Sequence, residues 1–311
     1  MKKLVLGLTA LVILSLAAAL AMSLSAERLP VDENASLVEL PPPMTTAGVT
    51  LQALPAGTMA SKAGFAYRGG ALGEERSFQM GGILVNHPTG ALLFDTGFGA
   101  DVDQHVKTTP LLMRAISKYT KATPVADQLR AGGFNIDTLI AVVITHAHWD
   151  HVSGLPDLGR ITVMLPKEEL SFIEGKDPAA ALIRSFSNVS YTPYNFKDGP
   201  YLGFDRSFDV YGDGAIVLVP AFGHTPGSVI AFINTSDGKR YALIGDLVWQ
   251  REGYEIPAQR PWLSRRMVDN DAEQVRQQVV HLHRLHRQLP EMVIVPAHDA
   301  RVWAELPRFP Q

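Results

Sequence analysis

The feature that most constrains this chain is residues 145–151, with the sequence THAHWDH, directly after the apolar run LIAVVI of residues 139–144. A run this rich in β-branched residues and bounded by polar ones predicts a buried strand. In α/β folds the loop after such a strand presents functional side chains. Imidazole suits zinc and similar ions, so we interpret this loop as metal-binding rather than incidentally polar. Its candidate ligands are His146, His148, Asp150 and His151.

Composition places the chain among globular proteins. Its 311 residues suffice for one large domain or two small ones. With 46% hydrophobic and 19% charged residues, it has no bias toward disorder. A net charge of -3 argues against a nucleic-acid partner, because nucleic-acid-binding domains are usually strongly basic. The absence of cysteine excludes disulfides, thiolate metal ligands and a Cys nucleophile.

The amino terminus has the features of an export signal. Lys2 and Lys3 precede an uncharged, mostly apolar run over residues 4–24. This run is longer than most signal cores, and about 20 apolar residues can span a bilayer. For residues 1–26, a cleaved signal peptide and an uncleaved membrane anchor through residues 4–24 therefore both remain open. In either case the lysines predict a domain outside the cytoplasm: periplasmic, secreted or anchored to the membrane.

Residues 27–47 are predicted to be a proline-rich linker, because the consecutive prolines 41–43 favour an extended conformation. We expect the globular domain to cover residues 48–311. Its predicted strands, from apolar runs and turn residues, are residues 49–54, 78–86, 91–95, 139–144, 161–165, 208–211, 215–219, 229–234, 240–244 and 292–295.

Helices are expected between these groups of strands. They cover residues 101–131, with breaks at Pro110 and Pro124, a segment that starts at Pro166, and residues 270–288. Residues 60–76 are predicted to be a loop over the site, and residues 175–207 an irregular, aromatic cap or insertion. This order of elements indicates two β-sheets packed together with helices outside.

Further ligand-type residues follow other apolar strands. His224, Asp246 and His298 each lie in a loop that contains Gly or Pro. Together with the first loop they make seven ligands, which exceeds the need of one tetrahedral zinc and suits two ions. We assign to the first ion His146, His148 and His224. We assign to the second ion Asp150, His151 and His298, with Asp246 as the bridge.

Two kinds of residue outside this set need an interpretation. Asp95, at the end of another predicted strand, either orients a metal-bound imidazole through a hydrogen bond or caps a turn. The histidines at 281, 283 and 286 lie on a predicted helix among arginines, and we expect them on a solvated face.

The motifs taken together resemble the metallo-β-lactamase superfamily. They are THAHWDH at 145–151, GHTPGS at 223–228, IGD at 244–246, FDTG at 94–97 and PAHD at 296–299. The resemblance covers residue 49 to the last strand. It implies an α/β (α+β) fold, a four-layer αβ/βα sandwich of two mixed β-sheets with helices outside. It also implies a two-metal site along one sheet edge, with the ligand roles above and Asp95 in support.

Within the superfamily, the chain is most similar to N-acyl homoserine lactone lactonases and related lactone or ester hydrolases. These carry a bridging Asp where the zinc β-lactamases have Cys. Three residues later they also carry a Tyr that contacts the substrate carbonyl, and here that position is Trp249. The candidate residues of the substrate pocket are Trp149, Trp249, Tyr254 and Tyr194.

The sequence therefore predicts a dimetal-dependent hydrolase for a small-molecule ester or lactone, with zinc as the expected metal and iron or manganese as alternatives. A metal-bridging hydroxide would attack the carbonyl, with Asp150 and Asp246 at the catalytic centre and Asp150 passing a proton to the leaving group. The alternatives on the same site are a phosphotriesterase or a glyoxalase II-like thioesterase. From other classes, an iron-dependent oxidoreductase similar to sulfur dioxygenases and a non-catalytic binding protein remain open, as does the oligomeric state.

Overall fold

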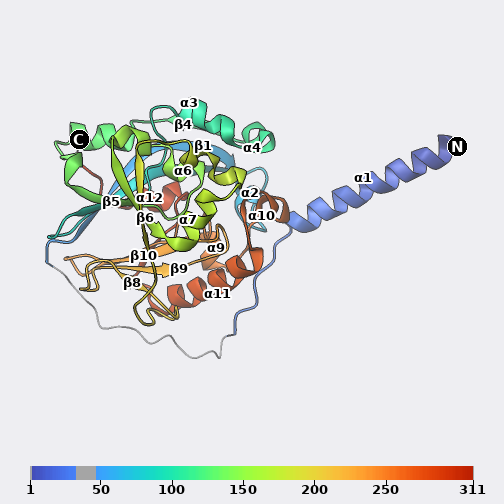
Figure 1. Ribbon diagram of the computed structural model, residues 1–311. Coiled ribbons are helices and arrows are strands. Elements are labelled where there is room, and N and C mark those ends of the chain that lie inside the picture. The colour runs from blue at the N-terminus through green and yellow to red at the C-terminus, as the bar shows by residue number, and fades with distance from the viewer. Residues whose placement is uncertain (1, 33–46, 311) are drawn as a thin grey trace.

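The computed structural model describes residues 2–32 and 47–310 (Figure 1). Within these ranges the strands form two sheets. The first sheet has the order β4-β1-β2-β3-β5-β6-β7, with β1 Thr50–Lys62, β2 Glu75–Asn86, β3 Ala91–Phe94, β4 Lys118–Lys121, β5 Leu139–Val143, β6 Ile161–Pro166 and β7 Val189–Tyr194. The second has the order β12-β11-β10-β9-β8, with β8 Phe208–Asp209, β9 Ile216–Pro220, β10 Val229–Asn234, β11 Arg240–Leu243 and β12 Val293–Val295.

Helices cover the outer faces of both sheets (Figure 1). Those that follow strands of the first sheet are α2 Ala63–Ala66, α3 Val102–His105, α4 Leu111–Ile116, α5 Val125–Ala131, α6 Trp149–Val152, α7 Lys167–Glu174 and α8 Ala181–Arg184. Those in the last third of the chain are α9 Glu252–Glu255, α10 Trp262–Val268, α11 Ala272–Gln288 and α12 Ala300–Trp303. Short 3₁₀ turns lie at Val106–Thr108, Ile136–Thr138, Leu155–Leu158 and Pro178–Ala180.

Strand β5 shows why the sheets pack as a sandwich. Its side chains alternate between two faces, and both faces are apolar. Val142 packs in the cluster between the first sheet and its helices, whereas Ala141 and Val143 pack against the second sheet. A third cluster lies between the second sheet and α11. This arrangement confirms the predicted αβ/βα sandwich with helices outside.

Strand direction brings the ends of several strands to one edge. Strands β3, β5 and β6 run parallel, and in the second sheet β11 and β12 run parallel. Strand β9 shares that direction, because β10 pairs antiparallel with both β9 and β11. The loops after β3, β5, β9, β11 and β12 therefore meet at the same edge of the sandwich.

Between β3 and β5 the structure departs from the predicted broken helix. Helices α4 and α5 do begin directly after Pro110 and Pro124. However, Lys118–Lys121 forms β4, which pairs antiparallel with β1. Strand β1 is longer than predicted and reaches Lys62, so it offers this short segment a partner. Its extra length also takes up the first part of the loop expected at residues 60–76.

Residues 175–207 are more regular than predicted, although residues 177–179 do line the cavity beside the candidate site described below. The segment contributes α8 and the strand β7, which pairs parallel with β6 at the edge of the first sheet. An edge strand tolerates Pro193, which cannot donate to a sheet ladder. The aromatic side chains of Tyr194 and Phe196 are buried between the sheets. Packing between the layers, rather than covering the site, is their role here.

The N-terminal helix α1, Lys2–Leu24, projects from the globular body (Figure 1). The residues that follow it are attached to that body: Leu29 is buried and its N–H donates to the carbonyl of Pro257 over 2.8 Å. Part of the expected linker is thus packed, while residues 33–46 lie outside the described residues. In the part of the chain that the structure describes, no helix combines the length and apolarity needed to cross a membrane.

Candidate metal centre

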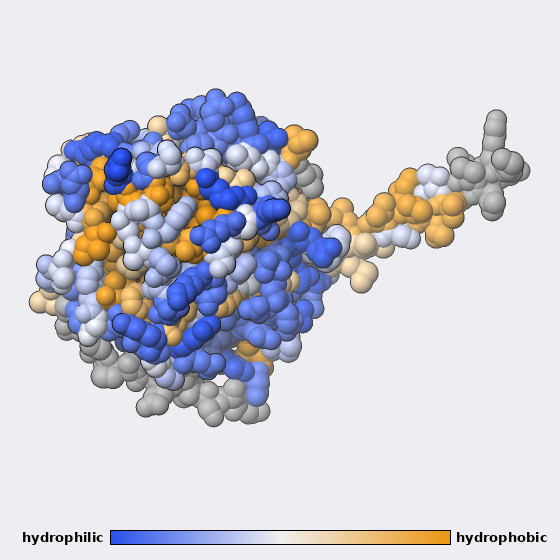
Figure 2. Space-filling view, in the orientation of Figure 1, coloured by the Kyte–Doolittle hydropathy of each residue, from blue (hydrophilic) through white to orange (hydrophobic). Residues whose placement is uncertain are grey.

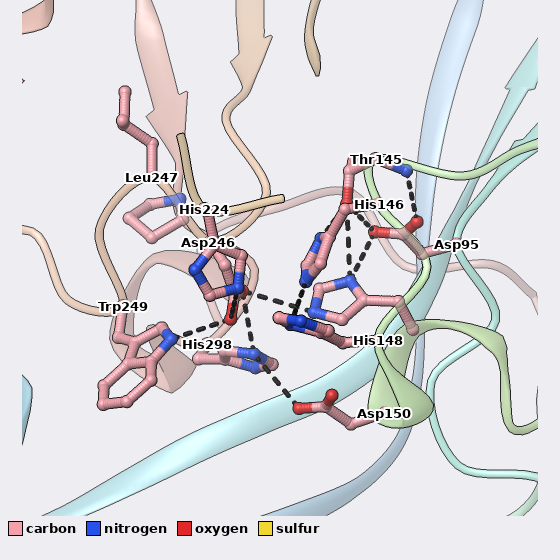
Figure 3. A network of polar contacts seen from close by, with 12 residues as sticks. Asp95, Thr145, His146, His148, Asp150, His224, Asp246, Leu247, Trp249 and His298 are labelled. Atoms are coloured by element: carbon pink, nitrogen blue, oxygen red, sulfur yellow. Dashed lines mark hydrogen bonds and ion pairs between the residues drawn. The ribbon is translucent and has the colours of Figure 1, made fainter. Parts of the chain in front are cut away.

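The strand ends described above carry the seven side chains expected as ligands, and the structure brings them together (Figure 3). Their ligand atoms form three groups in which all atoms lie within 4.8 Å of one another. One group is the set expected for the first ion, and another is the set expected for the second. The third group joins them through His146, His151 and Asp246.

Asp246 lies between the two sets. Its Oδ1 is 2.9 Å from His298 Nε2 and 3.2 Å from His151 Nε2. Its Oδ2 is 3.5 Å from His224 Nε2. One carboxylate oxygen thus faces each set, which is the geometry that a bridging ligand needs.

Several ligand atoms fit a metal because nothing else satisfies them. His151 Nε2, His224 Nε2 and Asp246 Oδ1 are buried and make no hydrogen bond. A buried polar atom without a partner is costly, and these atoms converge on one another. Imidazole nitrogens with carboxylate oxygens are the ligands that zinc, iron and manganese accept. The donor set therefore fits divalent metal ions.

Burial and mutual repulsion favour the metal-binding form of the first histidines. Burial, with the neighbouring histidines, lowers the pKa of His146 and of His148 well below the ordinary value. Neutral imidazole is the form that coordinates a metal. For His151, burial lowers the pKa, but the carboxylates of Asp95 and Asp246 outweigh this and raise it well above the ordinary value. This side chain thus lies between two carboxylates, those of Asp95 and Asp246.

Asp95 supports the THAHWDH loop through three hydrogen bonds. Its Oδ1 accepts from the backbone N–H of Thr145 over 2.7 Å, and its Oδ2 accepts from the Thr145 hydroxyl over 2.7 Å. Oδ2 also lies 2.8 Å from His151 Nδ1, which donates to it. Of the two interpretations of Asp95, the structure thus favours the one in which it orients an imidazole. Its φ of 52° is left-handed, a conformation that Asp adopts more readily than most residues.

A second carboxylate orients His224, and the sequence did not identify it. Asp269 Oδ1 lies 2.8 Å from His224 Nδ1 and also pairs with the guanidinium of Arg260. Both of these partners are buried. Asp269 lies 45 residues from His224, and no local motif marks it. Only the fold brings the three residues together.

Glu169 is a further residue that sequence reasoning missed, since it resembled an ordinary acid in the first turn of a helix. It is fully buried on α7. One carboxylate oxygen accepts from the N–H of Ala147 over 2.6 Å. The other accepts from the Thr225 hydroxyl over 2.7 Å and the Gly227 N–H over 2.9 Å. Glu169 therefore connects the two loops that carry the ligands of the first set.

A cavity of about 280 Å³ lies against the ligands. It contacts both sets, through His148 and His224 on one side and Asp150 and His298 on the other. None of the described residues that line it is Lys or Arg. Its apolar wall includes Met59, Phe65, Phe78, Met80, Pro110, Met113, Trp149, Pro178, Ala179, Trp249, Met267 and Val268.

The structure places the four candidate pocket residues in two different environments. Trp149 and Trp249 line the cavity. Tyr194 does not, because β7 turns it into the core between the sheets, where it stacks on Phe208 at 4.7 Å. Tyr254 does not either, since α9 packs it against α11. The expectation that these tyrosines contact substrate is corrected by their burial in packing clusters.

The histidines of α11 are also not on a solvated face, as the sequence suggested. His281 Nε2 donates to the carbonyl of Leu202 over 2.8 Å, and His283 Nδ1 donates to that of Tyr254 over 2.7 Å. Both are partly buried. These hydrogen bonds attach α11 to neighbouring segments. Both histidines lie away from the candidate metal ligands.

Comparison with known proteins agrees with this geometry. Residues 82–298 match the metallo-beta-lactamase superfamily. A "probable metallo-hydrolase" of Mycobacterium tuberculosis is 27% identical over 232 residues, which cover 70% of this chain and 73% of that protein. The N-acyl homoserine lactonase AttM of Agrobacterium fabrum is 23% identical over 233 residues, covering 74% and 85%.

The fold has counterparts among solved structures. One is an N-acyl homoserine lactone hydrolase with the product N-hexanoyl-L-homoserine bound at its catalytic metal center. It has a TM-score of 0.64 at 17% identity, over 84% of this chain and 97% of that chain. At this identity the likeness concerns the fold.

Proposed function

Because this chain belongs to the metallo-β-lactamase superfamily and is a metal-dependent hydrolase, we propose that it uses two divalent metal ions to cleave uncharged esters or lactones. The observation that carries this proposal is the position of the cavity. A mostly apolar pocket lies directly against both sets of ligand side chains. A substrate held there would have its carbonyl beside the metal centre.

The ligand roles follow from the three groups of converging atoms. His146, His148 and His224 would hold one ion. The other would be held by Asp150, His151 and His298, with Asp246 shared. Bound there, two such ions would lower the pKa of a water and polarise the carbonyl to be attacked. Zinc is the metal we expect, and the same nitrogen and oxygen donors accept iron or manganese.

Asp150 is placed to move a proton. Its Oδ2 lies 3.4 Å from His298 Nε2, and its side chain is 14% exposed, more than that of Asp246. It also lines the cavity. A carboxylate in this place can take a proton from the attacking water and return it to the leaving oxygen. We therefore assign to Asp150 the role of acid and base.

The residues that line the cavity help to distinguish between the alternative functions. Because none of the described residues in its wall is Lys or Arg, this wall offers no cationic side chain for substrates with several carboxylates, such as glutathione thioesters. Neutral phosphotriesters fit the same uncharged wall, so a phosphotriesterase remains the second candidate. An iron-dependent oxidoreductase would use the same ligands, and its distinguishing property is the metal it contains and that metal's absorption spectrum.

A hydrolase panel tests the proposal. Metal-free protein would be reloaded with zinc, manganese or iron and assayed with an aryl acetate, N-decanoyl homoserine lactone, paraoxon and S-lactoylglutathione. We expect metal-dependent cleavage of the aryl ester and the lactone, with nearly two metal equivalents per chain. The variant Asp246→Ala should lose most of the activity while circular dichroism shows that it is still folded. If no loaded form cleaves either the ester or the lactone, the proposal is wrong.

A further inference from the structure

The indole N–H of Trp249, the one donor of that side chain, bonds to another residue of the protein. Its Nε1 lies 2.7 Å from Oδ2 of Asp246 (Figure 3). This is the oxygen that faces His224 and the first set of ligands. An indole has one donor and no acceptor. While this bond exists, the side chain at position 249 cannot also donate to a substrate carbonyl, although its ring lines the cavity.

The indole ring is itself held from two directions. The guanidinium of Arg260 lies 4.9 Å from the ring centroid, at the distance of a cation–π contact. Phe78 packs against the ring edge-on, with centroids 5.9 Å apart. These contacts restrict the direction in which the N–H points.

Arg260 joins this aromatic contact to the bridging residue and to one histidine of the first set. It is only 3% exposed. Its Nη1 donates to the backbone carbonyl of Asp246 over 2.7 Å, and its Nη2 pairs with Asp269, the carboxylate that orients His224. One buried cation therefore contacts the segment of the bridging ligand, the partner of another ligand, and Trp249.

We propose that Trp249 and Arg260 act as a pair of positioning residues, which fix the bridging carboxylate and leave the substrate carbonyl without a donor from position 249. This inference rests on the proposed hydrolase function and adds to it a preference for one class of substrate. A missing oriented donor costs about 10²–10³ in rate. Substrates with good leaving groups need that donor least. Activated esters are therefore the preferred class, ahead of unactivated lactones.

The first experiment measures metal affinity without any substrate. Trp249→Phe keeps an aromatic ring but removes the N–H. We expect it to bind one of the two zinc ions about tenfold or more weakly in competition with a chelator, as loss of such supporting bonds does at other metal sites. Trp262→Phe is the matched control, since Trp262 is 56% exposed and is not among the residues lining the cavity. Wild-type affinity for both ions in Trp249→Phe would overturn the positioning role.

Tryptophan fluorescence provides a second readout. Zinc titration of the metal-free wild type should change its emission, because Trp249 is bonded to a ligand carboxylate. Trp249→Phe should show a smaller change than the wild type, with the remainder coming from Trp149, which also lines the cavity, and Trp262→Phe should keep the full change. Equal changes in all three proteins would contradict the proposal. Neither readout requires activity, so failure of the hydrolase proposal would be recognised separately by the substrate panel.

The third experiment addresses specificity. In Trp249→Phe, kcat for an aryl acetate should fall while KM stays within about threefold of the wild type, because the variant disturbs the centre more than the pocket. Trp249→Tyr supplies a phenol that can donate toward the cavity. It should raise the ratio of lactone to aryl-ester kcat/KM by about tenfold or more. An unchanged ratio in Trp249→Tyr would overturn the proposal that position 249 sets the preference for activated esters.

Discussion

Individual buried carboxylates hold in place the loops that carry the candidate metal ligands. Asp95 serves the loop after β5, Asp269 serves His224, and Glu169 connects these two regions. Each accepts hydrogen bonds from groups that burial would otherwise leave unsatisfied. The pKa of Glu169 is raised to about 7, because burial disfavours its charged form more than its three donors favour it.

This shift predicts a pH dependence of stability. The pKa of Glu169 is higher in the folded protein, about 7, than its ordinary value of 4.5. The folded state therefore binds the proton more tightly than the unfolded chain does. The resulting stabilisation, on the order of 3 kcal/mol at most, is complete below pH 4.5 and is lost as the pH rises through 7.

Glu169→Gln removes this titration, so we expect a flatter dependence of the unfolding free energy on pH between 4.5 and 7. Urea unfolding of the metal-free protein across this range measures it. Glu168→Gln is the control, since the neighbouring side chain is 39% exposed. A slope in Glu169→Gln equal to that of the wild type would show that this carboxyl does not control the dependence.

Among the elements, helix α11 illustrates how a periodic pattern becomes packing. Asp271 caps its start by accepting from the N–H groups of Glu273 and Gln274. Its buried side chains recur at helical spacing and cover the outer face of the second sheet. They are Val275, Val279, Leu282 and Leu285. Gln277 lies on the exposed side, and two histidines of the helix bond to neighbouring segments, so the helix closes one outer layer of the sandwich.

Shortening a side chain on the buried face of α11 should lower the free energy of unfolding. We expect Leu282→Ala to lower the free energy of unfolding by about 2–5 kcal/mol, because Leu282 is fully buried and its removal leaves a cavity. Gln277→Ala, at an exposed position of the same helix, should change it by about 0.5 kcal/mol or less. Chemical denaturation of both variants provides the measurement. Similar losses in both would mean that α11 contributes through its helicity rather than its packing.

At the scale of the whole molecule, the last turn of α1 and the residues directly after it are joined to the globular body. Arg68 donates to the carbonyls of Met22 and Ser25 over 2.8 and 3.1 Å. The Ser23 hydroxyl accepts from the N–H of Trp262 over 2.7 Å. Beyond this attachment, α1 presents an apolar surface, orange in Figure 2. The contacts lie where a signal peptide would be expected to end.

We predict that the chain is exported, as Lys2, Lys3 and the apolar run indicate, and that the mature protein retains residues 22–29. Cleavage after Ser25 or Ala26 would remove contacts that the folded domain uses. Fractionation of expressing cells and intact-mass measurement of the mature chain test the two parts separately. A soluble cytoplasmic pool of full-length protein would contradict export. A mature chain that begins at Glu27 or later would contradict the retention.

The sequence alone predicted the layered fold and the set of candidate metal ligands, because both depend on local patterns. Alternating apolar strands predict sheets with two faces, and the ligands follow strand ends in short motifs such as THAHWDH. Tertiary structure decided whatever depends on contacts between distant segments. Strand β4 forms because β1 extends far enough to pair with it. Tyr194 and Tyr254 are directed into packing layers.

The same reason explains the residues around the ligands that the sequence did not identify. Glu169, Arg260 and Asp269 belong to no motif, and each meets its partner only after the sheets and helices have packed. The direction of the Trp249 N–H is also set by packing, since Phe78 and Arg260 come from elsewhere in the chain. Motifs identify the atoms that can bind a metal, but the three-dimensional packing of side chains determines how those atoms are held.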